Sequence, residues 1–316
     1  MPNCVDKVDL CILQCYVASM TKERIKHIIE STVSDDRLLD TGVKGVQLFR
    51  VTDPMRCAPA VYEPSVIAIV SGCKEAILQG KSYEYDSSLY MCCAMPMPIE
   101  AGTPKASPDN PLLGVIISLD TSVMTKLAIE LESATGTIRH PKGEPLPPNL
   151  ALASWDDAFT EALLRLLQLV DCPTDIAILG DSRLRELYYA VLKGDAGVSA
   201  RRAFGVGNEI SRAIEYLSSH LSEAVTIEDI ATQVGMSRAV FHRKFRQATT
   251  MSPIQFVKSM RLNNAAMKLA TGMTVNEAAM EVGYASSSQF SREFKRMYGQ
   301  SPRQWSHDKQ IAAEMA

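Results

Sequence analysis

The sequence predicts an α+β fold, in which a small antiparallel β-sheet or barrel with flanking helices precedes an all-α domain. Between about Gly42 and Asp120, short apolar runs alternate with turn residues, as they do in antiparallel sheets. After Asp120 the apolar residues recur at a helical spacing of about 3.6 residues. The last hundred or so residues contain an internal repeat of helical segments. A chain of 316 residues is long enough for two domains with a core each.

The apolar runs of the first region are rich in β-branched residues, which favour strands. They are Val43–Thr52, Val66–Ser71, Glu75–Gln79, Leu89–Ala94 and Leu112–Leu119. Turn residues separate these runs, and the stretch from Pro96 to Pro111 is so rich in Pro, Gly and Ser that we expect a long connection there. This alternation of apolar runs and turn residues is typical of a small antiparallel sheet or barrel.

Three segments of the next region have the apolar spacing of helices: Thr121–Ser133, Trp155–Leu169 and Asp181–Lys193. A loop rich in Pro and Gly, from Gly136 to Pro148, separates the first two. The second segment has a leucine-rich face, which is either part of the core or a dimer contact. Its residues are Phe159, Leu163, Leu166, Leu167 and Val170.

The glycines of Gly205-Val206-Gly207 predict a hinge between two domains. We therefore expect an N-terminal extension and helix (1–40), a barrel with helices (41–205) and a helical domain (206–316). From Asn208 to Ala316 the chain has 13 Lys and Arg against 10 Asp and Glu, whereas the whole chain has a net charge of -3. A basic tail on an acidic body favours a DNA-binding module attached to a sensor.

The composition indicates an ordinary globular protein rather than a membrane or secreted one. No apolar run reaches the roughly 20 residues that cross a bilayer. Asp6, Lys7 and Asp9 interrupt the N-terminus, so it does not resemble a signal peptide, and we expect a cytoplasmic protein. All eight cysteines precede residue 173 and are expected to be reduced thiols.

The C-terminal region repeats itself with a spacing of about 49 residues. The matching residues are Phe241 and Phe290, Phe245 and Phe294, and Ser252-Pro253 and Ser301-Pro302. Each copy contains the parts of a helix-turn-helix unit. A threonine caps the first helix, a glycine ends it, and a serine caps the second helix. These residues are Thr226, Gly235 and Ser237 in the first copy and Thr274, Gly283 and Ser286 in the second.

The second helix of each copy has one apolar and one polar side. The phenylalanines at i and i+4 fix the apolar side, and the other side offers basic and hydroxyl groups. Such a stripe suits base edges in a DNA major groove, so we predict two DNA-binding units at about 226–249 and 274–298. A helix expected over Pro253–Ala270 would be a rod of roughly 27 Å, which places the units about one turn of DNA apart.

These residues resemble the AraC/XylS family of bacterial transcription regulators. The strongest part is the run from Val282 to Lys295, followed by Tyr298-Gly299 and Ser301-Pro302. The resemblance implies that the base-reading positions are Ala239, His242, Arg243, Ser287, Ser288, Gln289, Ser291 and Arg292. The phosphate contacts expected beside them are Arg238, Lys244, Arg246, Lys295 and Arg303.

Two features weaken the match of the first copy to a DNA-reading unit of this family. Ala239 cannot hydrogen-bond to a base and offers at most a contact with a thymine methyl group. Thr249-Thr250-Met251 stands where the family commonly has a glycine before Ser-Pro. We therefore expect the second unit to match the family pattern better than the first.

The N-terminal region resembles a sensor domain of the same family, through Tyr62-Glu63-Pro64-Ser65 and Gly72-Cys73-Lys74. This resemblance implies a cupin-like barrel with helices that binds a small-molecule effector and forms a homodimer. It also implies double-stranded promoter DNA and RNA polymerase as partners, with activation as the usual outcome. The operator, the target genes and the effector do not follow from the sequence.

A cupin-like barrel also raises an enzymatic interpretation, which the residues disfavour. No histidine lies between residues 43 and 120, so the histidine ligands of metal-dependent cupin chemistry are missing. We expect no metal, no cofactor and no catalytic site. The barrel is expected to hold an apolar effector pocket, with Arg56, Tyr62 and Lys74 as its polar groups.

The cysteines leave alternatives open. Cys57, Cys73, Cys92 and Cys93 could respond to electrophiles or oxidants if one thiol has a lowered pKa, or they could be small buried apolar residues. Because neighbouring strand residues point to opposite faces, we expect only one of Cys92 and Cys93 to face the interior.

Two further interpretations are compatible with the sequence. The N-terminal domain could serve only for dimerisation in a constitutive regulator. Cys4 and Cys11-x-x-x-Cys15 resemble half of the zinc site of DNA-repair methyltransferases, but a second Cys-x-x-Cys is absent. Met20 is an alternative natural start, because a helix is expected from Thr21 to Ser31.

Overall fold

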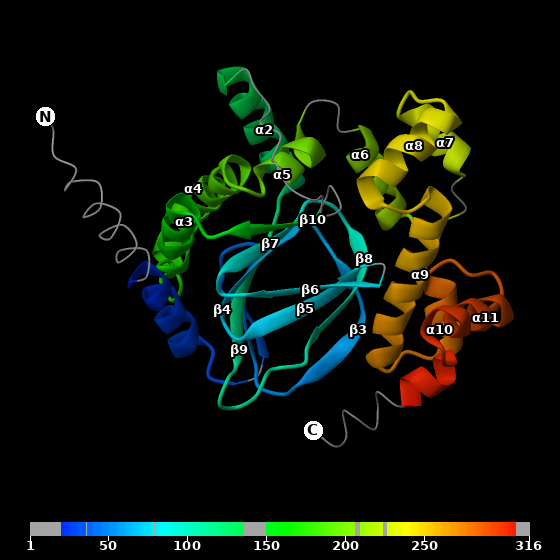
Figure 1. Cartoon of the computed structure of the whole chain (residues 1–316), viewed down its shortest axis with the longest axis horizontal. Coiled ribbons are helices and arrows are strands. Elements are labelled where there is room, and N and C mark those ends of the chain that lie inside the picture. The colour runs from blue at the N-terminus through cyan, green and yellow to red at the C-terminus, as the bar shows by residue number, and fades with distance from the viewer. Residues whose placement is uncertain are drawn as a thin grey trace, which may run out of the picture.

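The computed structural model describes residues 20–35, 37–78, 80–135, 150–205, 209–223 and 226–307. A two-sheet β-sandwich lies in the centre, with one group of helices on its left and the C-terminal helices on its right (Figure 1). Cys4, Cys11, Cys15, the expected loop Gly136–Pro148 and two residues of the expected hinge, Val206 and Gly207, lie outside the described residues.

Both sheets are antiparallel. The larger one has six strands in the order β1-β2-β9-β4-β7-β10, and the smaller has four in the order β3-β8-β5-β6. The larger sheet consists of β1 (Arg37–Asp40), β2 (Val46–Val51), β9 (Leu112–Ser118), β4 (Ser65–Ser71), β7 (Leu89–Cys93) and β10 (Leu150–Ser154). The smaller consists of β3 (Met55–Tyr62), β8 (Met97–Thr103), β5 (Cys73–Leu78) and β6 (Lys81–Asp86). The predicted α+β class is confirmed, and the barrel is an open sandwich whose two sheets are not joined by a ladder among the described strands.

The five predicted apolar runs all contain strands, but the expected connection after Pro96 is wrong in its first half. Strand β8 occupies that half and pairs with both β3 and β5. Proline is tolerated because the ladder with β5 covers only Glu100 to Gly102 of β8, so the missing N–H of Pro98 breaks no bond on that side. Pairing with distant strands, rather than local propensity, makes this segment a strand.

Helices cover the outer face of the larger sheet. They comprise a helix over residues 20–32, α2 (Thr121–Thr135), α3 (Asp157–Leu167), α4 (Pro173–Lys193) and α5 (Gly197–Phe204). Tyr90 of β7 stacks on Phe159 of α3 with ring centroids 4.0 Å apart. Leu163, Leu166 and Leu167 are buried as well, so the leucine-rich face of α3 is core. Helix α4 begins eight residues before the expected Asp181, because Pro173 is already suited to the first turn.

Both Cys92 and Cys93 are fully buried, so the expectation that only one would be enclosed is wrong. They do point to opposite sides of β7, but helices cover one face of this sheet and the smaller sheet covers the other. The Sγ atom of Cys93 donates to the carbonyl of Met95 at 3.1 Å.

The C-terminal region is helical throughout its described residues, apart from its turns. It comprises α6 (Glu209–Ser219), α7 (Ile227–Gln233), α8 (Arg238–Thr249), α9 (Pro253–Ala270), α10 (Val275–Glu281), α11 (Ser287–Tyr298) and a short helix over residues 302–307. The pairs α7–α8 and α10–α11 are the two predicted helix-turn-helix units, and α9 is the predicted helix between them. In the described part of the chain no helix is long and apolar enough to cross a membrane.

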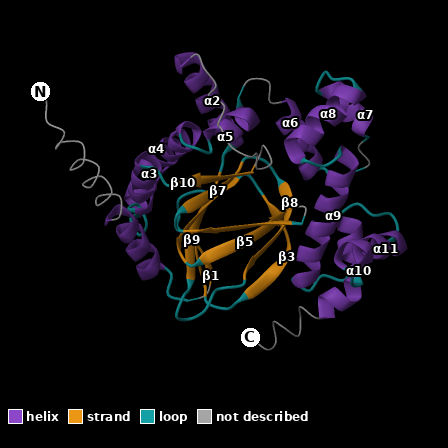
Figure 2. Ribbon diagram, viewed as in Figure 1, coloured by secondary structure: helices purple, strands orange, loops and turns teal. Residues whose placement is uncertain are grey.

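The C-terminal helices pack directly on the sandwich. Figure 2 shows α9 lying along β3 and β8, the strands of the smaller sheet that face it. One continuous hydrophobic core extends from the sandwich to Phe241, Phe245 and Phe256. The second helix-turn-helix unit has a separate core that includes Phe290 and Phe294. The first unit therefore shares its core with the N-terminal region, whereas the second is held through other contacts.

Candidate nucleic-acid interface and sensor site

The two helix-turn-helix units are built by the same local interactions. The Oγ1 atoms of Thr226 and Thr274 accept the backbone N–H three residues later and so cap α7 and α10. Ser237 and Ser286 cap α8 and α11 in the same way. These side chains satisfy N–H groups that a helix leaves unpaired at its start. The predicted caps are therefore confirmed in both copies.

Glycine ends the first helix of each unit in the left-handed conformation, with φ of +68° at Gly235 and +84° at Gly283. The end of the second helix differs between the copies. Gly299 has a φ of +77° after α11, whereas Thr250 adopts a φ of +64° after α8. A β-branched residue is strained there. The departure from the family pattern at Thr249-Thr250-Met251 thus falls on a position whose backbone favours glycine.

The second helix of each unit is anchored by its phenylalanines. Phe241 and Phe245 are fully buried with ring centroids 5.4 Å apart, and Phe290 and Phe294 repeat this arrangement at 5.4 Å. Because one side of each helix is fixed in a core, the opposite side faces solvent in a defined direction. Helices α8 and α11 are therefore equivalent in structure.

The opposite sides of these helices hold most of the residues that the sequence singles out. On α8 the exposed ones are Arg238, Ala239, Arg243, Lys244 and Arg246. On α11 they are Ser287, Ser288, Gln289, Arg292 and Lys295. His242 and Ser291 are half-buried and occupy equivalent positions in the two copies. Arg303 is exposed on the helix after α11.

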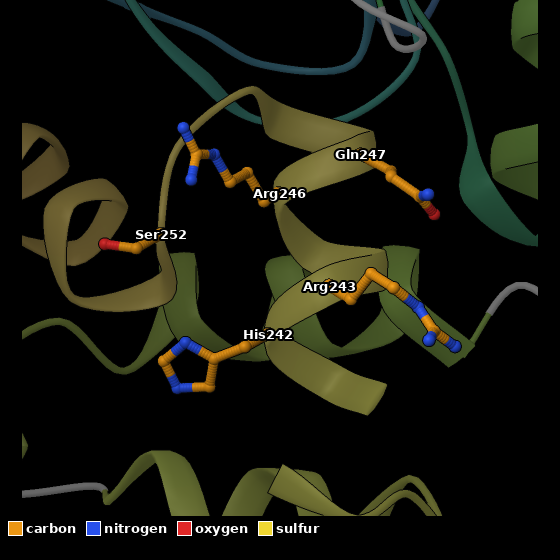
Figure 3. Close-up of a pocket in the computed structure, with 5 residues that line it drawn as sticks. All are labelled: His242, Arg243, Arg246, Gln247 and Ser252. Carbon is orange, nitrogen blue, oxygen red and sulfur yellow. The ribbon is translucent and has the colours of Figure 1, made fainter. Parts of the chain in front are cut away.

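Each of these two helices borders a groove. The first groove is lined by His242, Arg243, Arg246, Gln247 and Ser252 (Figure 3). The second is lined by Thr274, Val275, Asn276, Ser291, Ser301, Pro302 and Arg303. His242 and Ser252 of the first groove correspond to Ser291 and Ser301 of the second. The repeat in the sequence therefore produces a repeated surface, and Ser252 and Gln247 are groove residues that the predicted site did not include.

Figure 3 shows His242 and Arg246 on the side of α8 that faces Ser252, with Arg243 and Gln247 on its other side. The Nε2 atom of His242 is buried and has no hydrogen-bond partner among the described residues. A buried ring nitrogen of this kind is costly unless it is paired.

Most cations on these helices are available for an anionic partner. Arg238 is the exception, because its guanidinium forms an ion pair with Glu228 at 2.7 Å. Within the described ranges, the other cations on the exposed sides of α8 and α11 form no ion pair with an acidic side chain. Exposed ion pairs contribute little to stability. The pair with Glu228 therefore reduces the attraction of Arg238 for an anionic partner but does not abolish it.

Helix α9 fixes the second unit relative to the first. Its Lys258 forms an ion pair with Glu293 of α11 at 3.1 Å. The Nε atom of Arg261 donates to the carbonyl of Leu221 at 2.8 Å, which ties α9 to the turn after α6. The indole N–H of Trp305 donates to the carbonyl of Ala266 at 3.2 Å. The separation of α8 and α11 is therefore set by packed contacts.

Two of the predicted sensor residues come together between the sheets. The Nζ atom of Lys74 lies 5.6 Å from the ring centroid of Tyr62 and 5.5 Å from that of Phe49. Lys74 is also the register partner of Tyr85 on the neighbouring strand. We call Phe49, Tyr62, Lys74 and Tyr85 the inter-sheet cluster. Phe49 and Tyr85 were not predicted: Phe49 lies in an apolar run that indicated only a strand, and Tyr85 lies in β6, a strand that no predicted run included.

The inter-sheet cluster has unsatisfied polar groups. The hydroxyls of Tyr62 and Tyr85 are buried next to each other, and within the described residues neither forms a hydrogen bond of good geometry. Burial, with the adjacent Tyr62 hydroxyl, raises the pKa of Tyr85 well above its ordinary value, so this phenol remains a donor at neutral pH. Arg56, near the other end of β3, is exposed and does not join the cluster.

The four barrel cysteines all have raised pKa values. Burial and a hydrogen bond to Glu75 raise the pKa of Cys57 to about 11, with its Sγ 3.4 Å from Glu75 Oε2. Burial also raises the pKa of Cys73 and of Cys93, and it raises that of Cys92 to about 12. Reactive cysteines need the opposite shift, so these environments disfavour a thiolate-based sensor. In the described ranges no group of three His, Cys, Asp or Glu side chains could hold a metal ion.

Two family models match the chain. The model of the AraC-type transcriptional regulator N-terminus matches residues 42–199, which is half of the chain. A helix-turn-helix domain model matches residues 230–308, a range that includes most of the two units described above. The protein is a DNA-binding transcription regulator. It belongs to the AraC/XylS family.

Curated relatives match mainly in the C-terminal region. The transcriptional activator RhaS of Escherichia fergusonii is 32% identical over 116 residues, which are 36% of this chain and 39% of RhaS. The regulatory protein SoxS of Salmonella typhimurium is 30% identical over 99 residues, which are 31% of this chain and 92% of SoxS. The chain thus spans well under half the length of RhaS but nearly all of SoxS. These relatives are regulators, not enzymes.

A solved structure has a similar fold over most of the chain. ToxT from Vibrio cholerae aligns with a TM-score of 0.53 and 18% identity, covering 83% of this chain and 97% of that one. At this identity the likeness is one of fold. It supports the arrangement of an N-terminal β-domain followed by two helix-turn-helix units.

Proposed function

We propose that this regulator binds a specific promoter sequence through α8 and α11, and that its N-terminal domain binds a small-molecule effector that changes this binding. The observation that carries the DNA part is the repeat: two equivalent helices, each anchored by a buried phenylalanine pair, expose polar sides of the same design. The 18 residues of α9 form a rod of roughly 27 Å, close to one turn of DNA.

In this proposal the two helices contribute unequally to base reading. Arg243 and Arg292 occupy equivalent positions and suit bidentate bonds to guanine. Ser287, Ser288, Gln289 and Ser291 add hydrogen-bonding groups on α11, whereas α8 offers His242 and the apolar Ala239. Lys244, Arg246, Lys295 and Arg303 would contact phosphates, with a smaller contribution from the paired Arg238.

The inter-sheet cluster supports the effector part of the proposal. It combines an ammonium group near two aromatic rings with two buried phenol hydroxyls that form no hydrogen bond of good geometry among the described residues. These are donors, so the matching effector has an apolar body and an acceptor head, such as a carboxylate. One ToxT structure holds an unsaturated fatty acid, which belongs to the same chemical class.

The effector part is tested by measuring promoter affinity with a series of aliphatic and aromatic carboxylates and their matched alcohols. We expect at least one carboxylate to change the affinity and Lys74→Met to abolish that response, because methionine keeps the apolar stem but loses the charge. Lys81→Met is the matched control, since Lys81 also lies over a tyrosine ring but is exposed on the neighbouring strand. An equal response in both variants would contradict this assignment.

The second candidate is a constitutive regulator whose N-terminal domain only dimerises. Apolar side chains exposed on the outer helices favour a dimer contact there: Ile129 on α2 and Ile178 and Tyr189 on α4, with Ile178 72% exposed. A homodimer and a contact with RNA polymerase are compatible with both candidates. A sedimenting dimer whose promoter affinity no effector alters would favour the constitutive regulator.

A further inference from the structure

Asn263 is a buried polar residue on α9 that connects two parts of the molecule. Its side chain is only 2% exposed. Its Nδ2 atom donates to the carbonyl of Ala60 on β3 at 2.8 Å and to the carbonyl of Ile99 on β8 at 2.9 Å. Its Oδ1 atom accepts from the hydroxyl of Tyr298 at the end of α11, at 2.6 Å.

The two ends of this amide serve different domains. Both donors of the Nδ2 atom are used by the β-sandwich, and the Oδ1 atom is used by the second helix-turn-helix unit. Ala60 and Ile99 are register partners, so one side chain contacts β3 and β8 at the same rung of their ladder. A buried amide satisfied at both ends orients its partners strongly, because losing either bond leaves a polar group unpaired.

Both ends of the Asn263 amide contact elements that contribute to the proposed functional surfaces. Ala60 lies two residues before Tyr62 of the inter-sheet cluster on the same strand. Tyr298 is the last residue of α11, whose exposed side contains Arg292. Burial raises the pKa of Tyr298, so its hydroxyl stays protonated and continues to donate to Asn263.

The docked arrangement leaves the second reading surface open. Ser287, Ser288, Gln289 and Arg292 are all exposed while α9 is packed on β3 and β8. Docking therefore does not block these residues. It instead restricts where α11 can lie relative to α8, which favours DNA binding by lowering the entropy that binding would otherwise cost.

We propose that Asn263 is a positioning residue that ties α11 to the β3–β8 strand pair, so that the sandwich sets the DNA affinity of the second helix-turn-helix unit. The tie itself is independent of any ligand. Its use in regulation rests on the proposed effector function, because a ligand at Tyr62 would act on the strand that Asn263 contacts.

The test uses the full chain and a duplex selected for tight binding, with either half-site scrambled in turn. Asn263→Asp keeps an acceptor for Tyr298 but places a carboxylate against the carbonyls of Ala60 and Ile99, so it should release α9 from the sandwich. We expect faster amide hydrogen exchange in β3 and β8. We also expect a loss of affinity of at least about fivefold that depends on the second half-site only.

Two other variants separate the tie from a general loss of stability. Asn264→Asp is the matched control, because among the described residues the Nδ2 atom of Asn264 bonds only within α9, to the carbonyl of Met260 at 3.0 Å. It should behave as the parent protein. Tyr298→Phe removes only the bond to α11, so it should lower affinity at the second half-site while β3 and β8 keep their slow exchange.

The proposal is overturned if Asn263→Asp matches Asn264→Asp in both measurements, or if affinity rises, which would mark an inhibitory contact. If Asn263→Asp fails to fold, Tyr298→Phe decides through the second half-site alone. These readouts need no effector. Failure to find an effector would therefore count against the proposed sensor function. The results for the three variants would still decide whether Asn263 ties the two parts together.

Discussion

Gly235 and Gly283 occupy equivalent positions but stand in different surroundings. Both have a positive φ that an L side chain adopts with strain. A Cβ atom at Gly235 would meet nothing within 4 Å, whereas one at Gly283 would lie 2.6 Å from the carbonyl oxygen of Leu221. The second turn therefore needs glycine for two reasons and the first for one.

This difference predicts unequal effects of the same substitution. Gly235→Ala should destabilise the protein by about 1–2 kcal/mol from backbone strain alone. Gly283→Ala should cost clearly more, because the turn after α6 must also move away. Chemical denaturation of both variants measures the difference, and equal losses of unfolding free energy would show that the Leu221 contact yields easily.

The recognition helices are the elements on which specificity depends in our proposal. Arg292 and Lys295 lie on the same exposed side of α11, but the first is assigned to a base and the second to a phosphate. Arg292→Ala should reduce discrimination at one or two base pairs by about 1–3 kcal/mol. Lys295→Ala should weaken binding to all sequences and reduce the salt slope by about 0.9.

Binding measured over a library of single-base variants and several salt concentrations distinguishes these roles. Both variants keep the buried pair Phe290 and Phe294, so the fold of α11 is not at issue. If Arg292→Ala left the base preference intact, the register that we assign to this helix would be wrong. A changed base preference in Lys295→Ala would have the same consequence.

The reactivity of the cysteines follows from packing in the whole molecule, which encloses Cys92 and Cys93 on both faces of β7 and places Cys57 beside Glu75 of β5. Raising the pKa of Cys57 from 9.0 to about 11 lowers its thiolate fraction at neutral pH by about a hundredfold. At pH 7, alkylation of Cys57 should therefore be far slower in the native protein than in the unfolded one, and it should quicken as the pH approaches 11. Cys92 and Cys93 should be labelled only on unfolding.

Site-resolved mass spectrometry after timed alkylation measures these rates, with the same chain in denaturant as the control. Rapid labelling of Cys57 in the native protein at pH 7 would restore the thiol-based alternative. Slow labelling of all four barrel cysteines would leave a reversibly bound effector as the better account of sensing.

The sequence by itself determined the parts of this protein that depend on near neighbours in the chain. Caps at Thr274 and Ser286, the turn glycine between them and the phenylalanines at i and i+4 all act within a few residues, so their spacing predicted both helix-turn-helix units. The family resemblance and the exposed reading residues follow from the same local pattern.

Only the tertiary structure decided what depends on distant segments. Strand β8 exists because β3 and β5 pair with it, and Cys92 and Cys93 are both buried because helices and a second sheet cover β7. The inter-sheet cluster and the bonds of Asn263 join residues far apart in the chain. Side-chain burial on a sheet is set by packing rather than by intrinsic preference, so no local pattern could have predicted these contacts.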